Sequence, residues 1–246
     1  MSSGGNGVSP VKRKIIITCE HGGNHIPRAY RRFFKESVTL LGSHRGYDAG
    51  ALGLARRLVS EIEAELYLSS VSRLLVDLNR SPGSRNLFSH ITRGMDLVTK
   101  KKILNDYYFP YRNGVESVVA HAVKKNMQVL HVSVHSFTPV LDGSERTADV
   151  GLLYDPSRTG EKNFCARWRD EILSQCPDLV VRSNYPYRGT TDGMTSYLRK
   201  KHDGDLYRGI ELEMNQKHLV NASRFNNDVT RGVVRSLCSV LCGARR

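Results

Sequence analysis

The chain has 246 residues, of which 37 are Lys or Arg and 24 are Asp or Glu, so its formal charge at pH 7 is +13. A chain of this length forms one large domain or two small ones, and its core needs no disulfide bonds. The composition excludes collagen, a coiled coil and wholesale disorder, and no apolar run approaches the roughly 18 residues of a membrane span.

The first half of the chain contains two predicted buried strands and two predicted helices. Residues 14–19 are a continuous β-branched run, which is typical of a strand buried on both faces. Residues 48–66 have apolar side chains at helical spacing, and Asp48 is placed to be the N-cap or a first-turn residue. Residues 74–78 predict a second buried strand, and residues 95–125 predict a helix interrupted by Pro110.

The second half continues the alternation of strands with helices. Strands are predicted at 129–134, 150–154, 179–182 and 207–215, and helices at 162–175 and 227–241. This alternation predicts an α/β domain with a mostly parallel sheet. No repeat, linker or change in composition divides the chain, so we expect a flexible tail at 1–12 and a single domain at 13–246.

The cysteines and the N-terminus predict a cytoplasmic protein. Five cysteines form no CxxC pair, and an odd number without a signal peptide is typical of reduced thiols. The first residues, MSSGGNGVSPVKRK, lack the apolar stretch of a secretory signal.

The excess positive charge predicts an anionic partner or a solvated basic face. The basic residues are dispersed in short clusters, which makes a poor nucleic-acid stripe, and the aromatic residues of an RNA-binding sheet are missing. The dispersion argues against nucleic acid, although the charge of +13 leaves that alternative open.

Two histidines are placed to form part of a metal site. His21 and His135 each follow a predicted buried strand, and ligands bind at the carboxyl ends of strands in open α/β sheets. Either histidine alone is compatible with a structural, hydrogen-bonded role. A catalytic zinc takes three protein ligands and keeps one position open, and the candidates for a third, carboxylate ligand are Asp48 and Glu20. Asp48 has the alternative role of capping its helix.

Two acids on the last predicted strand are candidates for a general base. Glu211 and Glu213 are two residues apart, so both point to the same face. A carboxylate beside an activated water is a suitable base, whereas the structural alternative is an edge strand with a solvated face.

Basic and amide side chains in two loops are candidates for binding an acidic substrate. Arg73, Asn79 and Arg80 surround the second predicted strand, and Arg188 lies in a loop rich in proline and glycine. Arginine binds carboxylates through paired hydrogen bonds, so these residues favour a substrate with an acidic group.

The chain resembles the N-formylglutamate amidohydrolase family in six motifs between about residues 14 and 220, in the order TCEHGGNHIP, HRGYDAG, SRLLVDLNR, VHSFTP, NYPYRGTTDGMTSYL and GIELEMNQ. The resemblance implies a phosphorylase/hydrolase-like fold of the zinc-carboxypeptidase and aspartoacylase group, with a mixed, mostly parallel sheet sandwiched between helices. It also implies zinc-dependent hydrolysis of an amide in a small acidic N-acyl amino acid such as N-formyl-L-glutamate, with one Zn²⁺ per chain.

The same resemblance implies roles for individual residues. It implies that His21, Asp48 and His135 bind the metal, and it favours Asp48 over Glu20. The related zinc peptidases have a glutamate three residues after the first ligand, where this chain has Asn24, so the carboxylate must come from elsewhere.

The remaining motifs imply the base and the substrate contacts. The LEMNQ motif favours Glu213 over Glu211 as general base. The DLNR motif implies substrate contacts by Asn79 and Arg80, with Arg73 nearby. Two alternatives remain: a deacylase or carboxypeptidase of the same fold with another substrate, and a non-catalytic relative whose basic surface binds an anionic partner.

Overall fold

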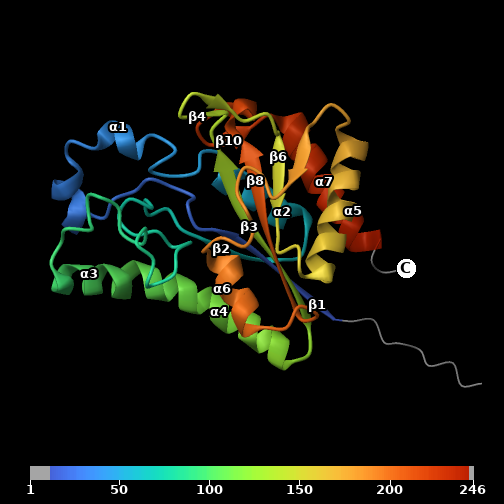
Figure 1. Ribbon diagram of the computed structural model, residues 1–246, viewed down its shortest axis with the longest axis horizontal. Coiled ribbons are helices and arrows are strands. Elements are labelled where there is room, and N and C mark those ends of the chain that lie inside the picture. Colours follow the sequence, from blue (N-terminus) through green and yellow to red (C-terminus); the bar gives the residue numbers. More distant parts are fainter. Residues whose placement is uncertain (1–11, 244–246) are drawn as a thin grey trace, which may run out of the picture.

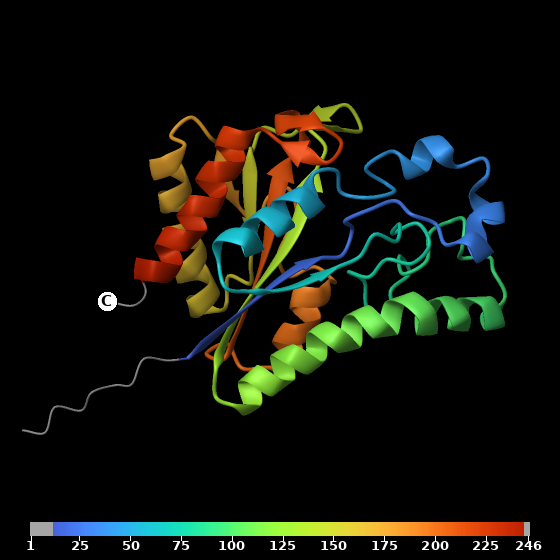
Figure 2. The same cartoon turned by 180° about the vertical axis from the view of Figure 1, so that it is seen from behind.

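The computed structural model describes residues 12–243, which form a central sheet with helices on both faces (Figures 1 and 2). Within this range the main sheet has six strands, in the order β2 (Glu65–Leu68), β1 (Arg13–Cys19), β3 (Gln128–Phe137), β8 (Tyr207–Asn215), β6 (Val150–Leu153) and β7 (Val181–Ser183). Every neighbouring pair is parallel except β8 with β6. The α/β fold with a mixed, mostly parallel sheet is therefore confirmed.

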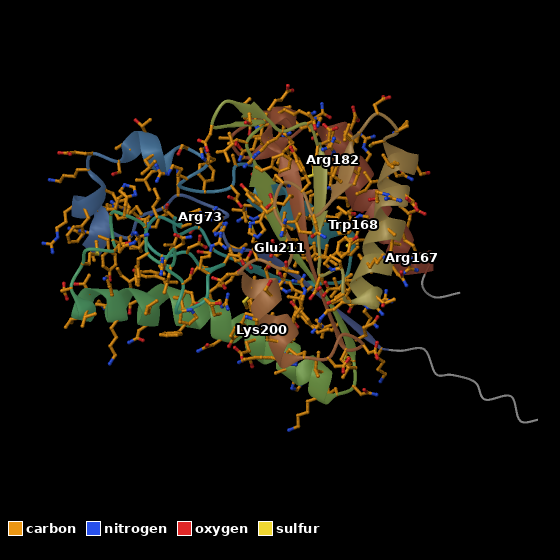
Figure 3. All side chains as sticks on the ribbon, viewed as in Figure 1. Arg73, Arg167, Trp168, Arg182, Lys200 and Glu211 are labelled. Carbon is orange, nitrogen blue, oxygen red and sulfur yellow. The ribbon has the colours of Figure 1, made fainter. Side chains whose placement is uncertain are left out.

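One face of the sheet packs against three helices through an apolar core. These are α2 (Ala51–Glu61), α5 (Thr159–Gln175) and α7 (Asn227–Gly243). On β3 the side chains of Leu130, Val132 and Val134 belong to this core. Trp168, which is fully buried, lies between α5 and the sheet (Figure 3). Because β3 and β8 are covered on both faces, they have almost no exposed side chains.

The opposite face is covered by α4 (Phe109–Lys124) and α6 (Met194–Lys201). Here Met194 and Leu198 of α6 pack with apolar residues of β1, β3 and α4. Polar side chains of β3 and β8 also lie on this face, towards the carboxyl ends of the strands. The sheet therefore has one largely apolar face and one face on which a polar site is built.

A second apolar cluster lies beside the sheet, where Figure 2 shows the chain extending away from the strands. It is formed by η1 (Arg28–Phe34), α1 (Val38–Leu41), α3 (Leu97–Ile103), η2 (Leu104–Tyr108) and residues 74–78. The predicted strand at 74–78 is wrong. Its backbone is folded into turns, with Leu75 N–H donating to Ser72 O and Asp77 N–H to Leu87 O, and the apolar run is buried by helices rather than by neighbouring strands.

The helical region predicted at 95–125 is confirmed, but it is continuous rather than broken. The helix α3 passes through one wide turn of π-helix, η2, directly into α4. Pro110 lies in the first turn of α4. Because proline has no N–H to donate to the carbonyl four residues earlier, the widened turn just before it accommodates the missing bond.

Other boundaries differ from the predictions in detail. The helix predicted at 48–66 ends at Glu61, and the following residues form the edge strand β2, which was not predicted. The strand predicted at 179–182 is shifted to Val181–Ser183, and α6 was not predicted. The strand at 207–215 and the closing helix are confirmed. Apart from Lys12, the predicted tail lies outside the described residues.

Short elements complete the chain: β4 (Val140–Leu141), β5 (Ser144–Glu145), η3 (Gln216–His218), β9 (Leu219–Asn221) and β10 (Arg224–Phe225). All five cysteines are free thiols. Of the helices between residues 12 and 243, none has the length and apolar character needed to cross a membrane.

Candidate metal centre

The candidate metal ligands meet at the carboxyl ends of the central strands. His21 follows β1 by two residues, and His135 lies near the end of β3 rather than beyond it. Asp48 precedes α2, whose N-cap is Gly50, so Asp48 is not the helix cap. The exposed fractions of His21, Asp48 and His135 are 2%, 5% and 3%. Three polar side chains this deeply buried need one another or a ligand.

One carboxylate oxygen lies between the two imidazole rings. Asp48 Oδ2 is 2.8 Å from His135 Nδ1 and 3.3 Å from His21 Nδ1. Possible ligand atoms of all three residues lie within 4.8 Å of one another. Two imidazole nitrogens and a carboxylate are a donor set that suits a catalytic zinc, which keeps a further position for water or substrate. The residues present therefore fit a metal ion.

The other nitrogen of each ring has its own acceptor. His21 Nε2 lies 2.7 Å from Asp77 Oδ1, so its N–H donates to that carboxylate. His135 Nε2 lies 2.8 Å from Ser133 Oγ, and Ser133 in turn donates to Glu20 Oε2 at 2.7 Å. These bonds fix both rings with Nδ1 directed at Asp48, as second partners do for metal-binding histidines.

Asp77 therefore orients the His21 ring directly, and Glu20 orients the His135 ring through Ser133, although neither belongs to the three-residue group. Glu20 Oε2 lies 3.5 Å from His135 Nε2, whereas Asp48 faces Nδ1 of the same ring. This geometry favours Asp48 as the third ligand. Asp77 is not among the site residues predicted from the sequence, although it is the first residue of the DLNR motif.

Arg73 compensates the negative charge of the buried acids. Its guanidinium lies 2.9 Å from Asp77 Oδ2 and 3.4 Å from Asp48 Oδ1. Burial alone would raise the pKa of Asp77, but Arg73 and His21 outweigh it and hold that pKa well below its usual value. Burial is likewise outweighed at Asp48, whose pKa is lowered by His21, His135 and Arg73. Both acids are therefore carboxylates when the protein is folded.

Glu213 is the carboxyl group with a free oxygen beside this cluster. It stands opposite His135 in the register of β3 with β8, and its Oε2 is buried without a hydrogen-bond partner among residues 12–243. Burial raises the pKa of Glu213 to about 8, although the nearby His135 opposes the shift. By contrast, Glu211 Oε1 accepts a hydrogen bond of 2.7 Å from Thr195 Oγ1. The alternative of a solvated edge strand is wrong, because β8 is central and buried.

The structure brings Asn79 and Arg80 to the cluster. Asn79 Oδ1 accepts from the backbone N–H of Met194 at 2.7 Å, and its Nδ2 lies 3.5 Å from His135 Nε2. Arg80 Nε lies 4.0 Å from Asp77 Oδ2 and has no hydrogen-bond partner in the described part of the chain. Figure 3 shows Arg73 on the segment beside the sheet and Glu211 on β8.

Arg188 is the predicted site residue that the structure does not bring into this cluster. Its side chain is exposed, and between residues 12 and 243 its guanidinium has no hydrogen bond or ion pair. Only its backbone oxygen is engaged, by Thr191. A role for Arg188 therefore remains a prediction from the sequence.

Comparison with known proteins finds one matching family and solved structures with the same fold. The sequence model of the family described as N-formylglutamate amidohydrolase matches residues 13–220. A solved structure of gene product Atu2144 from Agrobacterium tumefaciens is 26% identical, with a TM-score of 0.76 over 96% of this chain and 93% of that chain. An N-formylglutamate amidohydrolase from Ralstonia eutropha JMP134 has the same fold at 16% identity, with a TM-score of 0.69 over 96% and 94% of the two chains. No curated protein matches the sequence.

Proposed function

This chain belongs to the N-formylglutamate amidohydrolase family and is an amidohydrolase, and we propose that it is a zinc enzyme that hydrolyses a small acidic N-acyl amino acid. The first candidate substrate is N-formyl-L-glutamate. One observation carries the proposal: a buried group of His21, Asp48 and His135 lies beside Glu213, whose Oε2 atom is unpartnered within the described range.

In this proposal His21 and His135 bind Zn²⁺ through Nδ1, and Asp48 binds it through its carboxylate. The ion, when bound, supplies a Lewis acid that polarises the amide carbonyl and lowers the pKa of a water molecule to about 7. Asp77 and Ser133 hold the two rings in the orientation that presents Nδ1. Arg73 offsets the charge of Asp48 and Asp77.

Glu213 is the proposed general base and then the general acid. Its free Oε2 accepts a proton from the attacking water, the water oxygen bonds to the acyl carbon, and the C–N bond breaks. Glu213 then returns the proton to the departing amine, so the products of N-formyl-L-glutamate are formate and glutamate. Burial disfavours the carboxylate of Glu213, but a bound cation nearby favours it, so the same group can accept and donate a proton near neutral pH.

The proposed substrate contacts are Arg80, Asn79 and Arg73, with Arg188 as an outer contact. The unpartnered Nε of Arg80 is available for a substrate carboxylate, and a guanidinium binds such a group with paired hydrogen bonds. Anchoring the substrate at this point fixes the scissile amide relative to Glu213.

The direct test is to measure metal content together with turnover. We expect one zinc per chain by elemental analysis, release of glutamate from N-formyl-L-glutamate, and loss of turnover after chelation with recovery on adding Zn²⁺. N-formyl-L-glutamine is the matched substrate, because it lacks only the side-chain carboxylate, and N-acetyl-L-glutamate tests the acyl group. Full turnover of the metal-free protein would contradict the zinc proposal. Equal turnover of the glutamine and glutamate compounds would contradict the acidic substrate.

The predicted cytoplasmic location belongs to the same proposal. The free cysteines support it, since reduced thiols are typical of that compartment. Fractionation of cells that express the tagged protein tests it. Recovery in a membrane or extracellular fraction would contradict it.

A further inference from the structure

A cavity of about 820 Å³ lies next to the candidate metal centre, since Gly22 and Tyr47, the chain neighbours of His21 and Asp48, help to line it. Its other walls are α2, the β9–β10 hairpin and the start of α7. The helices α2 and α7 cover the apolar face of the sheet, whereas Glu211 contacts α6 on the other face. We call this space the arginine cavity. Its helical walls are on the apolar side of the sheet, whereas Glu211 and Glu213 face the other side.

The arginine cavity has a strongly positive lining. Within residues 12–243 no acid lines it, whereas four arginines do: Arg56, Arg57, Arg224 and Arg231. Two of these are neutralised, since Arg57 pairs with Glu61 at 2.8 Å and Arg231 pairs with Asp228 at 2.9 Å. The side chains of the other two, one on α2 and one on β10, make no hydrogen bond or ion pair in the described part of the chain. Two exposed arginines therefore line one cavity without a protein partner in the described part of the chain.

The remaining lining suits an organic molecule rather than a bare ion. Leu52 and Phe225 contribute apolar surface, and Asn227 and Thr230 contribute polar groups. The volume lies within the roughly 300–1,000 Å³ typical of sites for small organic ligands. A ligand of that size can contact the apolar wall and the arginines together.

The walls of the cavity are held in place by close backbone packing. A Cβ added to Gly53 of α2 would lie 2.4 Å from the Ser223 carbonyl oxygen, so the helix and the hairpin touch directly. Gly50, with a φ of 79°, has no room for a Cβ beside Leu219 and Phe225. The spacing between α2 and the hairpin is therefore fixed by the fold, as a preformed site requires.

We propose that the arginine cavity binds a small organic anion through phosphate or carboxylate groups. Guanidinium groups present a planar fork of donors that matches both kinds of anion, and Arg56 and Arg224 have no acidic partner in the described part of the chain. The proposal does not depend on the hydrolytic function, because none of the four arginines is among the proposed metal-binding, catalytic or substrate-binding residues. It also gives part of the excess charge of +13 a specific role.

The test is isothermal titration calorimetry on the full chain with three named probes. Glucose 6-phosphate and glucose form a matched pair that differs by the phosphate, and succinate represents the carboxylates. We expect glucose 6-phosphate or succinate to bind, glucose not to bind, and the stronger of the two anions to identify the preferred group. Equal binding of glucose and glucose 6-phosphate, or no heat from either anion at millimolar concentration, would overturn the proposal.

Substitutions test whether the anion binds in the arginine cavity. The double variant Arg56→Ala/Arg224→Ala is expected to weaken anion binding at least tenfold. The matched control Arg235→Ala, an exposed arginine on α7 outside the cavity, is expected to leave the affinity unchanged. Arg80→Ala tests whether the anion binds beside the candidate metal centre instead. Loss of binding in Arg80→Ala with retention in the double variant would assign the anion to that centre and contradict the cavity proposal.

Discussion

His135 and Glu213 stand directly opposite each other on the parallel strands β3 and β8, so their side chains leave the sheet on the same face. One is a candidate ligand, and the other has a carboxylate oxygen without a hydrogen-bond partner among residues 12–243. This pairing places a proton acceptor beside the proposed metal without making it a ligand. The prediction for Glu213→Gln depends on that separation of roles.

Replacing Glu213 by Gln should remove turnover and leave the metal in place. Loss of a general base lowers kcat by about 10²–10⁴-fold, while the ligands are untouched. The measurement is kcat with N-formyl-L-glutamate beside zinc per chain. Glu211→Gln is the control, because that carboxylate is engaged by Thr195, and we expect less than a tenfold loss. If zinc fell in Glu213→Gln, or if Glu211→Gln were the more damaged variant, the assignment would be wrong.

Replacing Asp77 by Asn should weaken metal binding through the orientation of His21. Asn keeps the shape but removes the charge that holds the ring through its 2.7 Å contact with Nε2. Loss of such a second partner typically costs about 10–100-fold in metal affinity. Competition with a zinc chelator dye measures it, and Asp96→Asn, a remote helix cap, is the control. An unchanged zinc affinity in Asp77→Asn would show that the contact does not position the ring.

His131 should make the folded state less stable in mild acid. It is fully buried between Thr18 Oγ1 and Tyr207 OH, and burial lowers its pKa to about 4, although Glu20 opposes the shift. The unfolded chain has a histidine pKa near 6.5, so it binds the proton first as the pH falls. This contribution to stability is present above about pH 6.5 and is lost towards pH 4.

The loss attributable to His131 between pH 7 and pH 5 is about 2 kcal/mol in the free energy of unfolding. Urea unfolding at the two pH values measures it, and His131→Gln should reduce the difference by that amount. His90→Gln, at an exposed histidine, should not. Equal pH dependence in wild type and His131→Gln would sink the prediction.

Gly151 on β6 should not tolerate a side chain. A Cβ there would lie 1.9 Å from the Tyr185 carbonyl oxygen and 3.2 Å from Glu213 Cβ. Overpacking of this kind costs about 1–3 kcal/mol, so Gly151→Ala should lower the free energy of unfolding by that amount and should also reduce kcat. Gly83→Ala is the control, since nothing lies within 4 Å of its added Cβ. A Gly151→Ala protein as stable as Gly83→Ala would contradict the packing argument.

The central strands could be predicted from the sequence because their burial leaves a simple pattern. The alternating run of β8 was placed at the bounds that the structure has, 207–215. Residues 74–78 have the same apolar character but are buried by helices, and an apolar run does not specify which partner covers it. The edge strand β2 has only four residues and follows a helix, so its pattern is too short to distinguish it from the end of that helix.

Part of the candidate metal site could also be predicted from the sequence, because three of its residues follow recognisable strands or lie in motifs. His21, Asp48 and His135 could be assembled from strand ends and motifs, and they lie together. The supporting contact of Asp77 could not be predicted, because residues 74–78 form turns rather than a strand, and an apolar run does not specify the direction of the Asp77 side chain. Arg188 lies in a loop. A loop is not paired with a strand, so the sequence does not specify where the Arg188 side chain lies relative to the sheet.

The two faces of β3 differ in polarity around its two histidines, and this has a consequence for folding. Leu130, Val132 and Val134 face the apolar core, while His131 and His135 alternate with them on the opposite face. A slip of one residue against β1 or β8 would drive both histidines into the apolar core and move the aliphatic side chains into the polar site. A slip of one residue therefore buries unsatisfied polar groups, each costing about 1–3 kcal/mol. The polar site selects the native alignment of the central strand as well as carrying the chemistry.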